Sequence, residues 1–275
     1  MNPPSAPSRT SAIKVTLAVM PALLIVSICI ALYLGVNADQ KESRPTEGDV
    51  TVPEMEGYLK KLNGMIGERS VETEDGQKAL RQVAAMTMGN LGPENLGYQI
   101  LKVQIDSAKG LLWPIIWINA GDRESKEPIV IAIPQAGSGT AAAFAYGFAE
   151  YLTSHETEKG VRLVFYPPLA EEDLRDWIWE RCGGENEKMA GFLEITGNGP
   201  RAEVSSLSFP EDKREFAETI SQEKGWADNL SPGVSAYPEL KIELAEQGRL
   251  SREGHAQNLI RLMPLVKDLI QGLAE

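Results

Sequence analysis

The residues best placed for chemistry lie in one short turn, QAGSGTAA at positions 135–142, which directly follows the apolar run IVIAIP. An apolar strand that leads through glycines into a helix is where α/β proteins place phosphates, nucleophiles or metal ligands. The residues predicted to bind a ligand at this turn are Gln135, Gly137, Ser138 and Gly139.

Two nucleotide-binding motifs are incomplete at this turn. A P-loop requires a lysine after its second glycine to reach the phosphates, and Thr140 stands at that position. A dinucleotide fingerprint is present in form at Gly137, Gly139 and Ala142. It also requires an acidic residue at the end of the next strand, which instead runs into two prolines at 167–168. The turn therefore argues against nucleotide binding.

A serine hydrolase stays open as an alternative. Its nucleophile elbow, G-x-S-x-G, would centre on Ser138, which has alanine and threonine where the glycines belong. Glu194 or Asp228, followed by His255, would supply the acid and the histidine of a triad in that chain order. The non-catalytic interpretation of Ser138 is that it forms the N-cap of the following helix. Its hydroxyl oxygen would accept a hydrogen bond from a backbone amide of the first turn.

The cysteines and histidines argue against other metal and thiol chemistry. Cys29 lies in an apolar run and Cys182 stands alone, so neither a disulfide within the domain nor a cysteine-based zinc site is expected. Cys182 is interpreted as a partly buried thiol. His155 and His255 lack a metal-type residue two or four positions later, and both are predicted to lie at the surface.

An uncharged apolar run, Val15–Val36, predicts a single membrane anchor. About 20 apolar residues span a bilayer core, whereas the apolar region of a signal peptide has about 7–15. A cleaved signal peptide is the alternative, because small residues precede Asp39. The only charged residues before the run are the basic Arg9 and Lys14, and basic residues stay on the cytoplasmic side. Both interpretations therefore place the rest of the chain outside the cytoplasm.

The predicted organisation is a cytoplasmic tail at 1–14, an anchor or uncleaved signal at 15–36, a polar linker at 37–53 and one α/β domain at 54–275. A domain of this length can fill a sizeable core. Beyond residue 36 the chain has 25 basic against 39 acidic residues, a net charge of −14. Such a surface repels phosphate backbones and anionic lipid, so no nucleic-acid partner is expected.

The alternation of strands and helices predicts an α/β fold, a three-layer sandwich in which helices cover both faces of a central mixed, mostly parallel sheet. The run IVIAIP has no polar residue, which is typical of a strand buried on both faces. The expected strands lie at 98–105, 111–120, 128–134, 161–166, 190–196 and 239–245. The expected helices lie at 54–68, 74–90 and 171–182, after the glycine turn, and from Glu211 and Ser251.

A series of segments matches the order and spacing of one known family. It begins with two helices and a strand entered through LG and GY, in MIGERSVETEDGQKALRQVAAMTMGNLGPENLGYQI. It continues through WINAGDRESKEPIVIAIP, AGSGTAAAFAYGFAEYL, KGVRLVFY, MAGFLEITGNGP and SAYPELKIEL. Most of residues 54–275 thus resembles the zinc aminopeptidase family that also contains glutaminyl cyclase and transferrin receptor ectodomains, and the resemblance implies that family's fold.

The resemblance also implies a centre of two zinc ions. Members hold them with a His-x-Asp at a strand end, an Asp-Asn before the glycine turn, a Glu-Glu pair, a later acid and a late histidine. Catalytic zinc needs histidine nitrogens and carboxylate oxygens, with an open position for water. Here Pro134 and Gln135 stand where the His and Asp would begin, and the segment with the bridging Asp is missing. Two ligands and the bridge are therefore expected to be absent.

Four acidic residues remain as candidates for the implied roles. Glu171 and Glu172 match the Glu-Glu pair as base and ligand, although acids are also favoured in the first turn of any helix. Glu194 matches the strand-end acid, and a carboxylate in so apolar a strand requires a partner. Asp228 stands at the Asp of an Asp-His pair, with Asn229 in place of the histidine. The candidate catalytic residues are Glu171, Glu172 and Ser138, and the candidate metal ligands are Glu172, Glu194 and Asp228.

The sequence therefore predicts a membrane-anchored extracytoplasmic domain that resembles zinc metallopeptidases but lacks most metal ligands, and so serves as a non-catalytic binding or scaffold protein. No cofactor is expected; the expected partners are a peptide or protein ligand, and the membrane through the N-terminal helix. The alternative is an active hydrolase, either a zinc metallopeptidase with relocated ligands or a Ser138 serine hydrolase. A third hypothesis, an interaction domain without an ancestral site, would be favoured by a fold that lacks the central mixed sheet.

Overall fold

The computed structural model describes residues 49–106, 110–122, 124–137, 139–168, 173–210, 233–235, 238–245 and 251–274. They all belong to one compact unit. The predicted anchor at 15–36 and the helix expected from Glu211 lie outside the described residues. Across the part of the chain that is described, no helix is both long and apolar enough to cross a membrane.

Helix starts follow from local capping. The backbone amide of Thr51 donates to Glu54 Oε2 at 2.8 Å, as in a capping box, and the side chain of Thr73 accepts from the Gly76 amide at 3.1 Å. The predicted helix at 54–68 is present as an α-helix continued by a π-helical segment. The helical elements are α2 (Val52–Leu59), η1 (Lys60–Ile66), α3 (Glu74–Leu91), α4 (Thr140–Ser154), α5 (Leu174–Cys182) and α7 (Arg252–Ala274).

The strands of the described residues form one mixed sheet in the order β1-β2-β4-β3-β5-β8-β6-β7. At its centre, β4, β3, β5 and β8 run parallel, whereas β2 is antiparallel to β1 and β4, and β6 is antiparallel to β8. The predicted mixed sheet is confirmed, with β6 and β7 as strands that the sequence did not reveal. The strands are β1 (Leu101–Asp106), β2 (Leu112–Gly121), β3 (Ile129–Pro134), β4 (Gly160–Tyr166), β5 (Gly191–Gly197), β6 (Arg201–Phe209), β7 (Gly233–Val234) and β8 (Glu239–Ala245).

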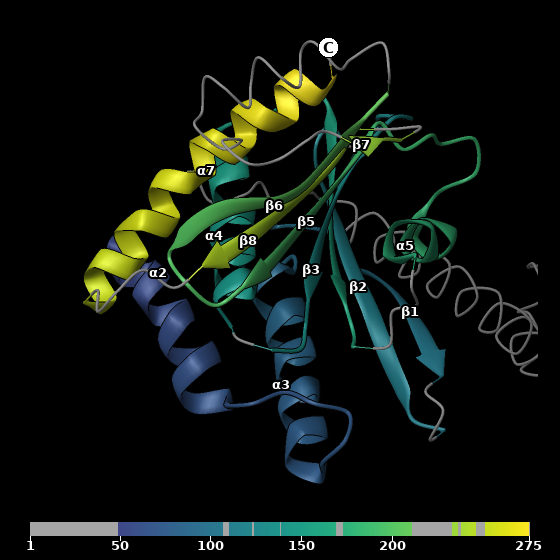
Figure 1. The fold of residues 1–275 in the computed structure, drawn as a ribbon. Helices are drawn as coiled ribbons and strands as arrows, with labels where there is room; N and C mark the ends of the chain where they lie inside the picture. The colour runs from purple at the N-terminus through teal and green to yellow at the C-terminus, as the bar shows by residue number, and fades with distance from the viewer. Residues whose placement is uncertain are drawn as a thin grey trace, which may run out of the picture. The chain divides into compact units, whose positions relative to one another are not determined.

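Helices cover both faces of the sheet, as the sequence predicts (Figure 1). The helices α2, α3, α4 and α7 lie on one face, where the larger apolar core forms. On the opposite face, Trp177 and Ile178 of α5 belong to a smaller core with Val130 and Val164 of β3 and β4. The strand β3 is buried throughout, apart from its last residue, Pro134. The glycine turn therefore leaves the sheet from a deeply buried strand, next to β4, which is buried at every residue.

Candidate functional site

The turn after β3 lies at the carboxyl end of the parallel strands, where open α/β sheets bind their ligands. Gln135, the first residue of the turn, is only 1% exposed. Its Nε2 donates to the carbonyl oxygens of Pro114 and Phe165, both at 2.9 Å. Its backbone amide donates to the Tyr166 carbonyl at 2.8 Å. The Gln135 side-chain amide thus ties the end of β3 to β4 and to β2 beyond it.

The glycines of the turn make contacts with the segment before α3. Gly137 has a positive φ of 74°, and its carbonyl oxygen accepts a hydrogen bond from the guanidinium of Arg69, which is 3% exposed. The Gly139 amide donates to Asn63 Oδ1 at 2.5 Å. The N-cap of α4 is Gly139, and Ser138, the predicted cap, lies outside the described residues. The Gly139 amide is thus bound by Asn63, which comes from a distant segment of the chain.

Glu194 of β5 is the candidate metal ligand whose surroundings the structure describes. Its side chain is 14% exposed, and Oε2 lies 2.9 Å from Lys241 Nζ on β8. Its other oxygen, Oε1, accepts from the Tyr166 hydroxyl at 2.9 Å. Burial and then the Glu194 charge raise the pKa of Tyr166, which keeps this phenol a donor. The partner that a carboxylate in this strand requires is therefore a lysine, supported by a tyrosine.

The structure does not describe the other candidate catalytic and metal-binding residues. Ser138, Glu171, Glu172 and Asp228 lie outside the described residues. Among the residues that are described, no group of three or more histidine, cysteine, aspartate or glutamate side chains is arranged to hold a metal ion.

The histidines and the cysteine have other surroundings. The ring of His155 stacks on Tyr151, with centroids 3.9 Å apart. His255 is half-buried rather than fully solvent-facing: its Nε2 is buried, and burial lowers its pKa, although a backbone hydrogen bond at Gly199 acts in the opposite direction. Cys182 is buried, and burial raises its pKa to about 12, so the thiol is protonated at neutral pH.

Similar architectures are known. No protein-family model and no curated protein matches the sequence. A solved structure assigned as a zinc-dependent exopeptidase of Bacteroides vulgatus is 13% identical, with a TM-score of 0.50, over 83% of this chain and 98% of that one. Glutaminyl cyclase of Tannerella forsythia is 12% identical, with a TM-score of 0.52, over 82% and 99%. The chain has the fold of the zinc exopeptidases and glutaminyl cyclases. The resemblance predicted from sequence is confirmed for the fold.

The described residues of this exopeptidase-like fold do not fit a zinc ion at the turn. Zinc is held by imidazole, thiolate and carboxylate groups. Gln135 uses its amide nitrogen, a donor, to bind two carbonyls. Glu194 has one oxygen at the ammonium of Lys241 and the other at a hydroxyl. A metal ion would have to displace a like charge to reach this carboxylate.

The pair of Lys241 and Glu194 gives a first testable expectation. Replacing Lys241 by methionine leaves the carboxylate with Tyr166 alone and is expected to lower the free energy of unfolding by about 1–2 kcal/mol, because the lysine is partly solvated. Urea denaturation measures the change, with Lys102→Met on the exposed side of β1 as the control. Adding Glu194→Gln to Lys241→Met should recover part of the lost stability, because it removes the unpaired carboxylate charge. If the double variant is no more stable than Lys241→Met, Lys241 does not stabilise the fold by neutralising Glu194.

Proposed function

We propose that the chain is a membrane-anchored, extracytoplasmic binding or scaffold protein that uses an exopeptidase-like fold without a zinc centre. The observation that carries this proposal is the ion pair between Glu194 and Lys241, 2.9 Å apart. A lysine ammonium satisfies the carboxylate and places a positive charge where a cation would have to bind. The Gln135 contacts support the same conclusion, since they use this side chain to join strands.

Hydrolase assays test the absence of catalysis. We expect the purified full-length chain, supplied with zinc, to turn over neither aminoacyl anilides nor peptides with N-terminal glutamine above the rate of Glu194→Gln and Ser138→Ala variants. A wild-type rate that falls in the Glu194 variant would support a metallopeptidase with relocated ligands. A rate that falls only in the Ser138 variant would support a serine hydrolase. Either result would overturn the proposal.

The anchoring part of the proposal depends on the apolar run at 15–36 and the basic residues before it. The full-length chain is expected to stay with membranes during alkaline carbonate extraction. Protease added to intact cells should degrade the domain at 54–275 and spare the tail. Release of the chain by carbonate, or its cleavage after residue 38, would contradict the anchor.

The net charge bears on the class of partner. The chain carries a formal net charge of −12, which disfavours nucleic acid and favours a peptide or protein ligand with basic or neutral groups.

A further inference from the structure

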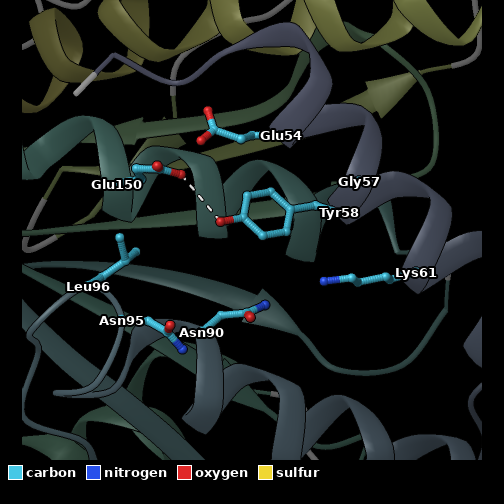
Figure 2. A pocket seen from close by; sticks show the side chains of 8 residues that line it. All are labelled: Glu54, Gly57, Tyr58, Lys61, Asn90, Asn95, Leu96 and Glu150. Atoms are coloured by element: carbon cyan, nitrogen blue, oxygen red, sulfur yellow. Dashed lines mark hydrogen bonds between the residues drawn. The ribbon is translucent and has the colours of Figure 1, made fainter. Parts of the chain in front are cut away.

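A second region with polar chemistry lies away from the glycine turn. It is a pocket of about 390 Å³ between α2, the end of α3 with its following loop, and α4. Six polar residues line it: Glu54, Tyr58, Lys61, Asn90, Asn95 and Glu150 (Figure 2). Glu150 lies in the last turns of α4, roughly 16 Å along the helix from Gly139. Neither Glu194 nor Lys241 lines this pocket.

One side of the pocket is acidic. Figure 2 shows the carboxylates of Glu54 and Glu150 on the same side, with the Tyr58 hydroxyl directed at Glu150. The Tyr58 hydroxyl donates to Glu150 Oε2 at 3.3 Å. Burial and then the charge of Glu54 raise the pKa of Glu150, although the bond from Tyr58 acts in the opposite direction. The Glu54 charge disfavours a charged Glu150, and a cation placed beside the two carboxylates would offset this repulsion.

The other side of the pocket carries hydrogen-bond donors. Lys61 and Asn90 point into the space across from the two carboxylates (Figure 2). Asn90 Nδ2 is buried and has no hydrogen-bond partner among the described residues. A buried donor without an acceptor is costly, so this amide calls for an acceptor from a ligand. The Asn95 amide, by contrast, already donates to the Gly89 carbonyl at 2.5 Å.

We propose that this pocket binds a free α-amino acid as its zwitterion. The ammonium group lies between Glu54 and Glu150, and the carboxylate accepts from Asn90 Nδ2 and Lys61. Both halves of the ligand then meet the opposite charge, and the unpaired amide gains its acceptor. A volume of about 390 Å³ is at the small end for ligand pockets, which suits a single amino acid. This site does not depend on whether the glycine turn binds zinc.

Ligand binding to the purified full-length chain tests the proposal. Thermal shift is measured with each proteinogenic L-amino acid at millimolar concentration, and calorimetry follows for the one that gives the largest shift. Its decarboxylated amine and its N-acetyl derivative are the matched probes, since each lacks one charge. We expect only the zwitterion to bind. Equal binding of the amine would overturn the proposed carboxylate contact, and no shift with any amino acid would overturn the proposal.

Neighbouring lysines provide a matched pair of variants. Lys61 lines the pocket, whereas the adjacent, exposed Lys60 does not. Lys61→Met is expected to weaken amino-acid binding roughly tenfold or more, while Lys60→Met leaves it unchanged. Equal affinities for the two variants would contradict the role of Lys61. Loss of binding in both would mean that the pocket in Figure 2 is not the binding site.

Glu150→Gln separates loss of binding from loss of folding. The raised pKa means that the folded state favours protonated Glu150, so its contribution to stability falls as pH rises through that pKa. Glutamine can still accept from Tyr58 and carries no charge. The variant is therefore expected to melt higher than wild type at neutral pH, with the difference vanishing below the ordinary glutamate pKa. It should also bind the amino acid at least roughly tenfold more weakly. A variant that is folded and binds as wild type does would overturn the assignment.

Discussion

Replacing Arg162 by methionine is expected to lower the free energy of unfolding by about 3–5 kcal/mol, the largest effect of any substitution proposed for this fold. Arg162 lies in β4 and is 4% exposed. Its Nη1 and Nη2 bind the Glu187 carboxylate at 2.9 and 3.2 Å, and its Nε donates to Asn119 Oδ1 at 2.8 Å. Nη1 also donates to the Cys182 carbonyl at 2.5 Å. Methionine fills the space and removes the guanidinium donors from all three acceptors, so that Glu187 keeps only the bond from the Gly184 amide.

The matched control is Arg201→Met, because Arg201 and Glu203 form an ion pair at 3.4 Å with both side chains more than half exposed. Chemical denaturation should show a change of about 0.5 kcal/mol or less for this exposed pair. Adding Glu187→Gln to Arg162→Met should recover part of the loss, since the unpaired charge is then removed. A loss below about 1 kcal/mol for Arg162→Met would contradict the claim that this arginine holds the end of α5 to the sheet.

The Arg162 effect should also depend on pH. Burial alone would raise the pKa of Glu187, but the bonds from Arg162 and from the Gly184 amide lower it below its ordinary value. A lowered carboxyl pKa contributes stability above the unfolded-state pKa, and this contribution is lost as pH falls through the folded-state pKa. The difference between wild type and Arg162→Met is therefore expected to shrink in acid.

Gly139→Ala is expected to destabilise the protein by about 3 kcal/mol, the second largest effect, because the turn has no room for a methyl group. A Cβ at this position would lie 2.3 Å from Leu62 Cβ and 2.7 Å from Asn63 Oδ1. The clash would separate the start of α4 from η1 and weaken the bond from the Gly139 amide to Asn63. Thermal and urea unfolding measure the loss.

Gly89→Ala in α3 is the control for this substitution, since nothing lies within 4 Å of a Cβ built there. Alanine is a better helix former than glycine, so this variant should be up to about 1 kcal/mol more stable. Equal effects of the two substitutions would show that the turn accommodates a side chain. The contacts between the turn and η1 would then be looser than the distances around Gly139 indicate.

Much of the fold could be predicted because its elements have strong local signals. The apolar run of β3 and the helical period of α3 each specify their own structure. The strand β6 was missed, although Ala202 and Val204 alternate with polar residues along it. Its partner is β8, a later strand, and antiparallel pairing with a bulge near Val204 cannot be recognised without that partner.

The site was predictable only in part, for a similar reason. That Glu194 needs a partner follows from the apolar strand around it, but the partner depends on strand register. Lys241 lies directly opposite Glu194 because β5 and β8 pair in parallel at that position. Arg69 and Asn63, which bind the turn, come from segments about seventy residues earlier. Contacts of this kind are set by tertiary packing, and no local pattern in the sequence reveals them.

The zinc content of the purified full-length chain tests the central claim most directly. The protein is dialysed against zinc and then against metal-free buffer, and plasma mass spectrometry measures the metal that remains. A Glu194→Gln variant treated in parallel gives the background. If an ammonium replaces the metal at Glu194, the wild type should hold no more zinc than this variant. About two tightly bound zinc ions per chain in the wild type, lost in the variant, would contradict the account and indicate a working metallopeptidase centre.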